Sequence, residues 1–406
     1  MSLNKPNLLV IPRNQDWQAE HDSGRAGGPL GLSLAERRLV KRCFNACGHQ
    51  LTDKQLVPEK VRLFRKAGTA IFESSGRFPA GLDAAIRQIT RYDVNTARTA
   101  VDLTWGEKAK TPGDILIHAV ELTGQWQHCL VFPAFQAWAQ GQQPYTVDLV
   151  PGQTVELTPT PLAAVLENSD GARLELSLGS DVWRWQAGLG CQATPADRLD
   201  LDVKDHGVLC RRSISQEGQS GELFPEKRIY RFTSLLAWLA PDEAAAAAPV
   251  PASAIGTRLS ISANRGLSSQ ELAACGEKPS VILDFADVDW PESGRRTIGE
   301  GACWESNPVQ NLARRLIRQL ADYSPCGQLT ILGLTPGLCD CPKHCLKRQS
   351  TPHWDLDAIL DFAAWMRHRL GPSWQITVPQ PAPWNLLPSL AKLGCQPAFG
   401  PNDDAK

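Results

Sequence analysis

A short segment near residue 340 carries five side chains that could bind a metal ion. It contains Cys339, Cys341, His344 and Cys345, and His353 follows eight residues after Cys345. Structural zinc is usually held by four cysteine or histidine ligands in a tetrahedron. Three thiolates this close together would repel one another unless a cation or protons compensated their charge. The spacing therefore predicts a metal site, with zinc as the expected ion.

The ligand set expected for this zinc site is Cys339, Cys341, Cys345 and a fourth group. The fourth group is His353 or Cys303, with His344 as a further choice. Cys303 follows the strand expected over residues 280–285, and the cysteine cluster follows the strand expected over residues 328–334. Loops that follow parallel strands lie at the same edge of the sheet, so Cys303 could reach the cluster. An iron–sulfur cluster with four thiolates is an alternative occupant, and a loop of free thiols is the other.

Three aspartates at the end of another expected strand form a second candidate site. Asp284, Asp287 and Asp289 come at or after the end of the strand expected over residues 280–285, whose apolar run is residues 281–283. Mg²⁺ prefers one or two carboxylates plus water molecules, and carboxylates at the end of a strand often provide them. These three residues are the predicted catalytic residues if the protein is a divalent-metal enzyme that acts on nucleotides or phosphodiesters. The alternative is a solvated acidic turn whose carboxylates cap loop amides.

The segment from residue 36 to residue 66 has nine basic and three acidic residues, although the whole chain has a net charge of −1. Such a local excess of positive charge could follow a phosphate backbone. A solvated helix face is the alternative. The candidate nucleic-acid contacts are Arg37, Arg38, Lys41, Arg42, Arg62 and Arg65.

The amino-terminal half is expected to be helical first and mostly antiparallel β afterwards. Residues 33–36 have the pattern of a helix capping box, and residues 79–92 resemble an amphipathic helix. Between residues 113 and 240, short segments alternate polar and apolar residues or are rich in β-branched side chains. We therefore expect an α+β domain over residues 1–240.

The Ala/Pro-rich segment 241–256 is expected to be a linker, because it cannot form a core of its own. After it, a capping box at Ser268 and Glu271 predicts a short helix, and longer helices are expected over residues 307–323 and 355–370. Strands are expected over residues 258–262, 280–285, 328–334 and 374–378. This alternation predicts a Rossmann-like, doubly wound parallel α/β domain over residues 257–406.

Composition limits the class of protein. A chain of 406 residues usually has two domains, and 42% hydrophobic with 21% charged residues is typical of a folded protein. No apolar run is long enough for a signal peptide or a membrane span, so a cytoplasmic location is expected. In a reducing compartment the twelve cysteines are expected to be buried groups or metal ligands rather than disulfides.

Together these patterns predict a zinc-stabilised, nucleic-acid-associated recognition or accessory component of a larger complex, with other protein subunits as possible partners. One alternative is the divalent-metal enzyme described above, which would use Mg²⁺. The other is a non-catalytic protein-interaction scaffold, because thirteen tryptophans could serve interfaces.

Overall fold

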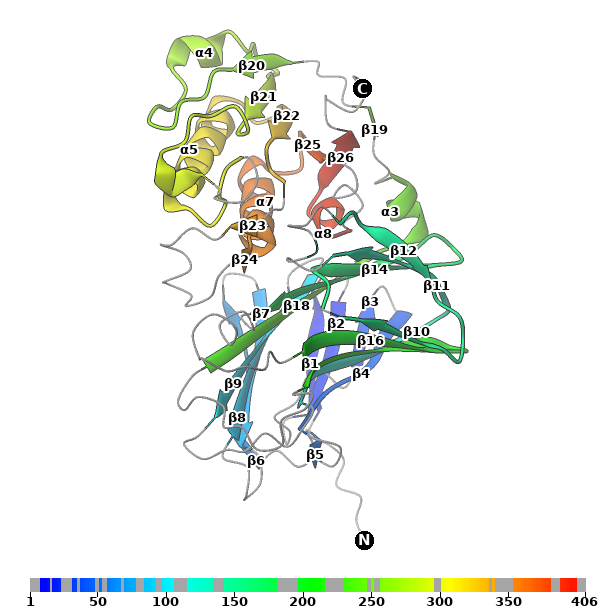
Figure 1. Cartoon of the computed structure of the whole chain (residues 1–406). Coiled ribbons are helices and arrows are strands. Elements are labelled where there is room, and N and C mark those ends of the chain that lie inside the picture. Colours follow the sequence, from blue (N-terminus) through cyan, green and yellow to red (C-terminus); the bar gives the residue numbers. More distant parts are fainter. Residues whose placement is uncertain are drawn as a thin grey trace. The chain divides into compact units, whose positions relative to one another are not determined.

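The computed structural model describes most of the chain between residues 8 and 399 (Figure 1). Beyond the two ends, it does not describe residues 15–16, 23–30, 35–36, 48–50, 53–56, 67–68, 78–83, 93–95, 106–114, 134–136, 138–141, 159, 181–195, 216–228, 247–249, 252–255, 296–300, 336–337, 340–352 and 381–387. The chain divides into two units, residues 1–238 and 239–406.

The first unit contains two nine-stranded sheets. Sheet A consists of β1 (Leu8–Asn14), β2 (Trp17–Asp22), β3 (Gly31–Leu34), β4 (Arg37–Cys47), β5 (Leu51–Thr52), β10 (Ile115–Thr123), β13 (Thr154–Leu157), β16 (Ala196–Lys204) and β17 (Gly207–Ser215). Sheet B consists of β6 (Val57–Lys66), β7 (Thr69–Arg77), β8 (Ala84–Tyr92), β9 (Thr96–Trp105), β11 (Trp126–Phe132), β12 (Tyr145–Asp148), β14 (Ala163–Asn168), β15 (Arg173–Ser180) and β18 (Ile229–Leu239).

The two sheets share a hydrophobic core. It combines buried residues of sheet A, such as Leu122 and Leu201, with residues of sheet B, such as Phe72 and Trp238. The strand pairs whose register is described in this unit are antiparallel, for example β7 with β8 and β16 with β17. Side chains that point away from the core alternate with those that point into it, as expected for a β-sandwich.

The structure contradicts the predicted helical segment. Residues 37–47 form β4, residues 57–66 form β6 and residues 84–92 form β8. The strand period of β8 is hard to recognise because two of its core-facing residues, Gln88 and Thr90, are polar although they are buried. A pattern of apolar residues therefore did not distinguish this strand from an amphipathic helix.

The second unit contains one six-stranded sheet, a two-stranded ladder and several helices. The sheet has the order β19 (Val250–Pro251), β26 (Cys395–Phe399), β25 (Trp374–Gln380), β22 (Gly327–Leu332), β21 (Ser280–Asp284) and β20 (Thr257–Leu259), and the ladder joins β23 (Leu338–Cys339) to β24 (His353–Trp354). The helices are α3 (Pro241–Ala246), α4 (Ser269–Ala273), α5 (Asn307–Tyr323), α7 (Leu356–Leu370) and α8 (Pro388–Lys392), with a 3₁₀ turn, η2, at Glu292–Gly294.

The predicted fold class, a helical region followed by a doubly wound Rossmann-like domain, is wrong. The described chain is mostly antiparallel β, and its parallel sheet is small. The pairs in this sheet are parallel, but β20, β21, β22, β25 and β26 lie side by side in chain order. A doubly wound sheet would reverse its strand order at a switch point. Because crossovers are almost always right-handed, this singly wound order places the connecting helices on one face of the sheet.

The helices of the second unit have clear sequence causes. α4 has the expected capping box, in which the Ser268 hydroxyl and the Glu271 carboxylate bond to each other's backbone amides. α5 begins with Pro308 in its first turn and buries an apolar stripe that includes Leu312, Leu316 and Leu320. Among the described helices, none is long and apolar enough to span a membrane.

Candidate functional site

The carboxyl edge of the parallel sheet holds the predicted catalytic aspartates. Asp284 is the last residue of β21, and its carboxylate forms an ion pair with Arg258 of β20. Its Oδ1 atom also accepts hydrogen bonds from the backbone amides of Ala286, at 2.9 Å, and Asp287, at 3.2 Å. The carboxylate of Asp284 is therefore used to join two strands and to cap the loop that follows.

The other two aspartates point into solvent. The side chain of Asp287 is 81% exposed and lies 3.5 Å from Arg258, and that of Asp289 is 92% exposed and pairs with Arg295. The structure thus gives each of the three carboxylates an arginine partner, and Asp284 caps loop amides, which is the role that the acidic-turn alternative gives to these residues. Their assignment as catalytic residues stays a prediction.

The two loops at this edge are tied together by residues that sequence reasoning missed. Asp355, which precedes α7, is fully buried and accepts a hydrogen bond from the backbone amide of Trp304 at 3.2 Å. The indole of Trp304 donates to the carbonyl of Gly333 at 3.0 Å. These contacts join the segment after β21 to the segment after β22. In the sequence, these contacts were signalled only by a tryptophan, Trp304, and by an aspartate directly before a helix, Asp355.

The predicted zinc ligands fall largely outside the described residues, including Cys341, His344 and Cys345. The backbone of Cys339 pairs directly with that of His353 in the β23–β24 ladder, and Cys303 is fully buried. No group of three or more His, Cys, Asp or Glu residues that could hold a metal ion occurs in the described part of the chain.

The fold corrects the description of the chain as a Rossmann-like protein, and the part of the chain that the structure describes provides no zinc site. The structure shows a mostly antiparallel β protein, and its described residues contain no metal-binding group. Because Cys341, His344 and Cys345 lie outside the described residues, the predicted zinc ion or iron–sulfur cluster stays a prediction.

The predicted nucleic-acid contacts do not share a helix face. Arg37, Arg38, Lys41 and Arg42 belong to β4 in sheet A, whereas Arg62 and Arg65 belong to β6 in sheet B. In the described contacts, Lys41 pairs with Glu121 at 3.1 Å, Arg38 lies 3.9 Å from Glu20, and Arg62 pairs with Glu73. The predicted basic helix is therefore wrong, and its charges are divided between two sheets.

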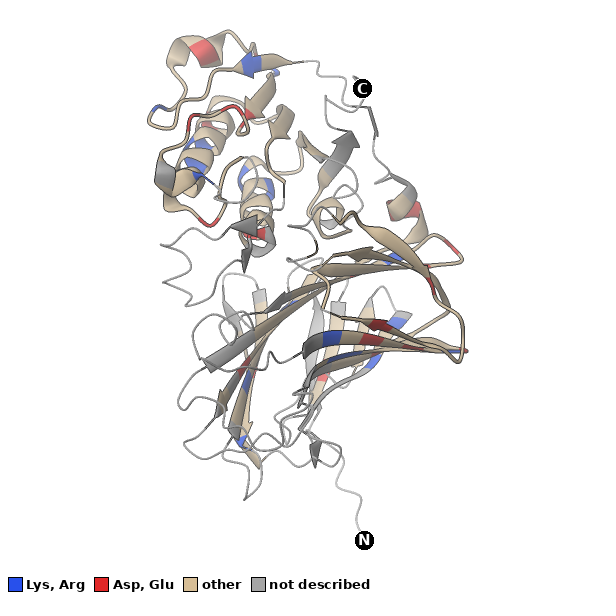
Figure 2. Cartoon of the chain, viewed as in Figure 1, with Lys and Arg blue, Asp and Glu red and all other residues tan. Residues whose placement is uncertain are grey.

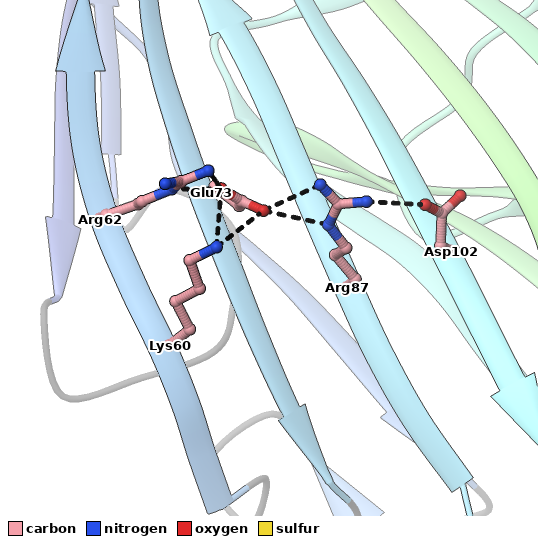
Figure 3. A network of polar contacts seen from close by, with 5 residues as sticks. All are labelled: Lys60, Arg62, Glu73, Arg87 and Asp102. Atoms are coloured by element: carbon pink, nitrogen blue, oxygen red, sulfur yellow. Dashed lines mark hydrogen bonds and ion pairs between the residues drawn. The ribbon is translucent and has the colours of Figure 1, made fainter.

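Arg62 instead belongs to a charged cluster on sheet B that the sequence did not reveal (Figure 3). At its centre is Glu73 of β7, on the face that points away from Phe72 and the sandwich core. Its carboxylate pairs with Arg62, with Lys60 of β6 at 3.4 Å and with Arg87 of β8 at 2.9 Å. Cross-strand register brings these residues together, because Arg62 is the direct partner of Glu73.

The centre and the rim of this cluster differ in exposure. The side chain of Glu73 is 4% exposed, whereas those of Lys60, Arg62 and Arg87 are 47%, 51% and 49% exposed. Arg87 also lies 4.0 Å from Asp102 of β9. Burial alone would raise the pKa of Glu73, but hydrogen bonds from Arg87 and Arg62 and their charges outweigh it, so the pKa is lowered. Glu73 is therefore a buried anion beneath a rim of exposed cations.

Comparison with known proteins gives no family for this chain. No protein-family profile and no curated protein sequence matches it. Among solved structures, the Slr1438 protein of Synechocystis sp. PCC 6803 aligns with 58% of this chain and 98% of its own, at 10% identity and a TM-score of 0.39.

Two further structures have similar scores. A galactose mutarotase related enzyme of Lactobacillus acidophilus aligns with 58% of this chain and 98% of its own, at 6% identity and a TM-score of 0.35. The alpha-N-acetylgalactosaminidase NagBb of Bifidobacterium bifidum aligns with 92% of this chain and 58% of its own, at 10% identity and a TM-score of 0.37. Scores this low assign neither a fold family nor an activity.

Proposed function

We propose that the chain is a non-catalytic accessory component of a larger assembly, located in the cytoplasm, that binds an acidic protein segment. The binding surface is the basic face of β6–β8, which we define as Lys60, Arg62, Arg87 and Arg91. The observation that carries the proposal is the Glu73 cluster, in which the negative charge is buried and the positive charges are exposed (Figure 3).

This arrangement prepares the cations for binding. Holding a long basic side chain in one position costs conformational entropy when a partner binds. Glu73 already restrains Lys60, Arg62 and Arg87 at the surface, so part of that cost has been met during folding. Arg91 of β8 is exposed four residues after Arg87 and therefore lies on the same face of the strand.

The chemistry of the face favours an acidic protein over nucleic acid. Binding of single-stranded nucleic acid usually combines cations with exposed aromatic rings on which bases stack. The exposed large aromatic side chains among the described residues are Tyr145 of β12 and Tyr323 of α5, and neither lies on β6–β9. Phe64 of β6 is half-buried, and the guanidinium of Arg62 covers its ring at 4.7 Å from the centroid. The carboxylates of an acidic protein segment can bind to the cations alone and do not need aromatic rings.

Two further observations agree with the proposal. The carboxylate of Asp284 is occupied by Arg258 and loop amides, which supports a bracing role rather than metal-dependent catalysis. In addition, cysteines such as Cys129, Cys275 and Cys395 are not disulfide-bonded, which is usual for a protein of a reducing compartment.

The proposal is tested with the full chain and a fluorescent poly-glutamate peptide of about ten residues. We expect binding that weakens as salt is raised. Replacing Arg91→Gln should weaken binding about three- to tenfold, because it removes one charge-assisted contact. The matched control is Arg173→Gln on the same sheet, where Arg173 pairs with Glu167 outside the basic face.

Two outcomes contradict the proposal. Equal losses in the Arg91 and Arg173 variants would show that the peptide senses only overall charge. Tighter binding of a single-stranded oligonucleotide than of the peptide, with the same dependence on Arg91, would assign the face to nucleic acid instead.

A further inference from the structure

Helix α5 of the second unit carries three arginines that have no carboxylate partner among the described residues. They are Arg314, Arg315 and Arg318, and they lie outside the apolar stripe that the helix buries. Other arginines of this unit are paired: Arg258 with Asp284, Arg265 with Glu271 and Arg369 with Asp322. Figure 2 shows basic residues on both α5 and its neighbour α7.

Two of these three arginines share one aromatic side chain. The guanidinium carbons of Arg314 and Arg318 lie 5.6 Å and 5.7 Å from the ring centroid of Trp365 on α7. Trp365 in turn stacks on the fully buried Phe362, at 6.1 Å between centroids. The indole is thus held by the core of the unit, and it positions both guanidinium groups by cation–π contact.

This arrangement leaves positive charge and hydrogen-bond donors unused. Arg314 and Arg318 are one helical turn apart, and like charges at that spacing repel each other. The Nε atom of Arg314 is buried and has no hydrogen-bond partner among the described residues. A buried donor without an acceptor is unfavourable. An anion bound by the ends of both guanidinium groups would offset the repulsion between their charges.

We propose that Arg314, Arg318 and Trp365 form a binding site for a tetrahedral oxyanion of the phosphate type. A guanidinium group presents a planar fork that matches two oxygens of one anion. A phosphate or sulfate group has enough oxygens to engage two forks at once, whereas a carboxylate has only two. The site lies in the second unit and uses no residue of the β6–β8 basic face, so it goes beyond the proposed function.

Arg315 supplies the matched control for this site. It has the same charge, lies on the same helix and is exposed, but its side chain passes close to Gly266 and has no described contact with Trp365. A general attraction of anions to α5 would depend on Arg315 as much as on Arg318. A site built on the indole would depend on Arg314 and Arg318 only.

The test measures binding by isothermal titration calorimetry at low salt, with inorganic phosphate, acetate and a phosphoserine peptide as probes. We expect phosphate to bind at least about tenfold more tightly than acetate. Arg318→Gln and Arg314→Gln should each weaken phosphate binding at least about tenfold, and Arg315→Gln less than about twofold. Arg318→Lys keeps the charge without the fork and should also lose affinity.

The outcomes separate the alternatives. Equal losses in the Arg315 and Arg318 variants, or no binding of either phosphate probe, would overturn the proposal. Binding of the phosphoserine peptide alone, lost in Arg318→Gln and kept in Arg91→Gln, would support the site and identify its ligand as a phosphoryl group on a partner protein; binding lost in Arg91→Gln and kept in Arg318→Gln would overturn it. Arg91→Gln serves as a second control: phosphate binding that survives it shows that this site is independent of the acidic-partner face.

Discussion

Burial of His21 should make the first unit sensitive to mildly acidic pH. The imidazole of His21 is fully buried between the sheets, stacks on Phe72 at 3.6 Å, and its Nε2 lies 2.8 Å from the hydroxyl of Tyr92. Burial lowers the pKa of His21 from 6.5 to about 3. The folded protein therefore keeps this imidazole neutral at pH values at which the unfolded chain protonates it.

The sign and size of the effect follow from proton linkage. Because the folded pKa lies below the unfolded pKa, the unfolded state binds more protons as the pH falls below 6.5, and the free energy of unfolding decreases. The slope approaches ~1.4 kcal/mol per pH unit, so between pH 7.5 and pH 5.0 this histidine should remove ~2 kcal/mol. The loss should continue until the pH reaches the folded pKa.

The measurement is urea denaturation of the full chain at several pH values, followed by circular dichroism of the strands. Other groups also titrate, so the informative quantity is the difference between the wild type and His21→Gln, which cannot protonate there. Tyr92→Phe is the control, because it removes the hydroxyl partner but keeps the burial that lowers the pKa. A His21→Gln variant with the same pH slope as wild type would refute this reasoning.

Two further substitutions test how buried charge and tight backbone contacts stabilise the units. Glu73→Gln should lower the free energy of unfolding by ~2 kcal/mol at neutral pH, measured by urea denaturation, because it leaves clustered cations without their buried anion. This difference from wild type should vanish as the pH falls through the lowered pKa of Glu73, where the wild-type carboxylate is also neutral. Gly333→Ala should cost at least ~2 kcal/mol, because Gly333 has φ +77° and an added Cβ would lie 2.6 Å from the amide nitrogen of Ala286. Gly276→Ala, at φ +74° with nothing within 4 Å of an added Cβ, should cost only ~1 kcal/mol in the same assay, and equal costs at the two glycines would contradict the steric argument.

The sequence was most informative about local structure in the second unit. The helix expected over residues 307–323 is present as α5, and the strand expected over 280–285 is present as β21. The capping box at Ser268 is also confirmed. These elements have strong local signals: a proline in the first helical turn, a continuous apolar run, and reciprocal hydrogen bonds between residues three apart.

The sequence was least informative where distant residues decide the structure. β4 pairs with β10, about seventy residues later in the chain, and no local signal specifies that partner. The core-facing row of sheet B contains the polar residues Ser74, Gln88 and Thr90, so its strands lack the apolar alternation that identifies a half-buried strand. Local charge density was misread for the same reason, because a basic segment assumed to be one helix is divided between two sheets.

Charge pairing separates residues with a structural role from residues available for binding. Asp284 is held by Arg258 and loop amides, and Glu73 is surrounded by three cations, so both carboxylates are used within the fold. The charges that remain at the surface are positive both around Glu73 and at Arg314 and Arg318, the two places for which we propose binding. The cations around Glu73 belong to a network of ion pairs, whereas Arg314 and Arg318 have only Trp365 as a described partner. The two surfaces should therefore respond differently to salt: an extended acidic segment that contacts several cations should lose affinity steeply, and a single oxyanion held by two guanidinium forks should lose it more gradually.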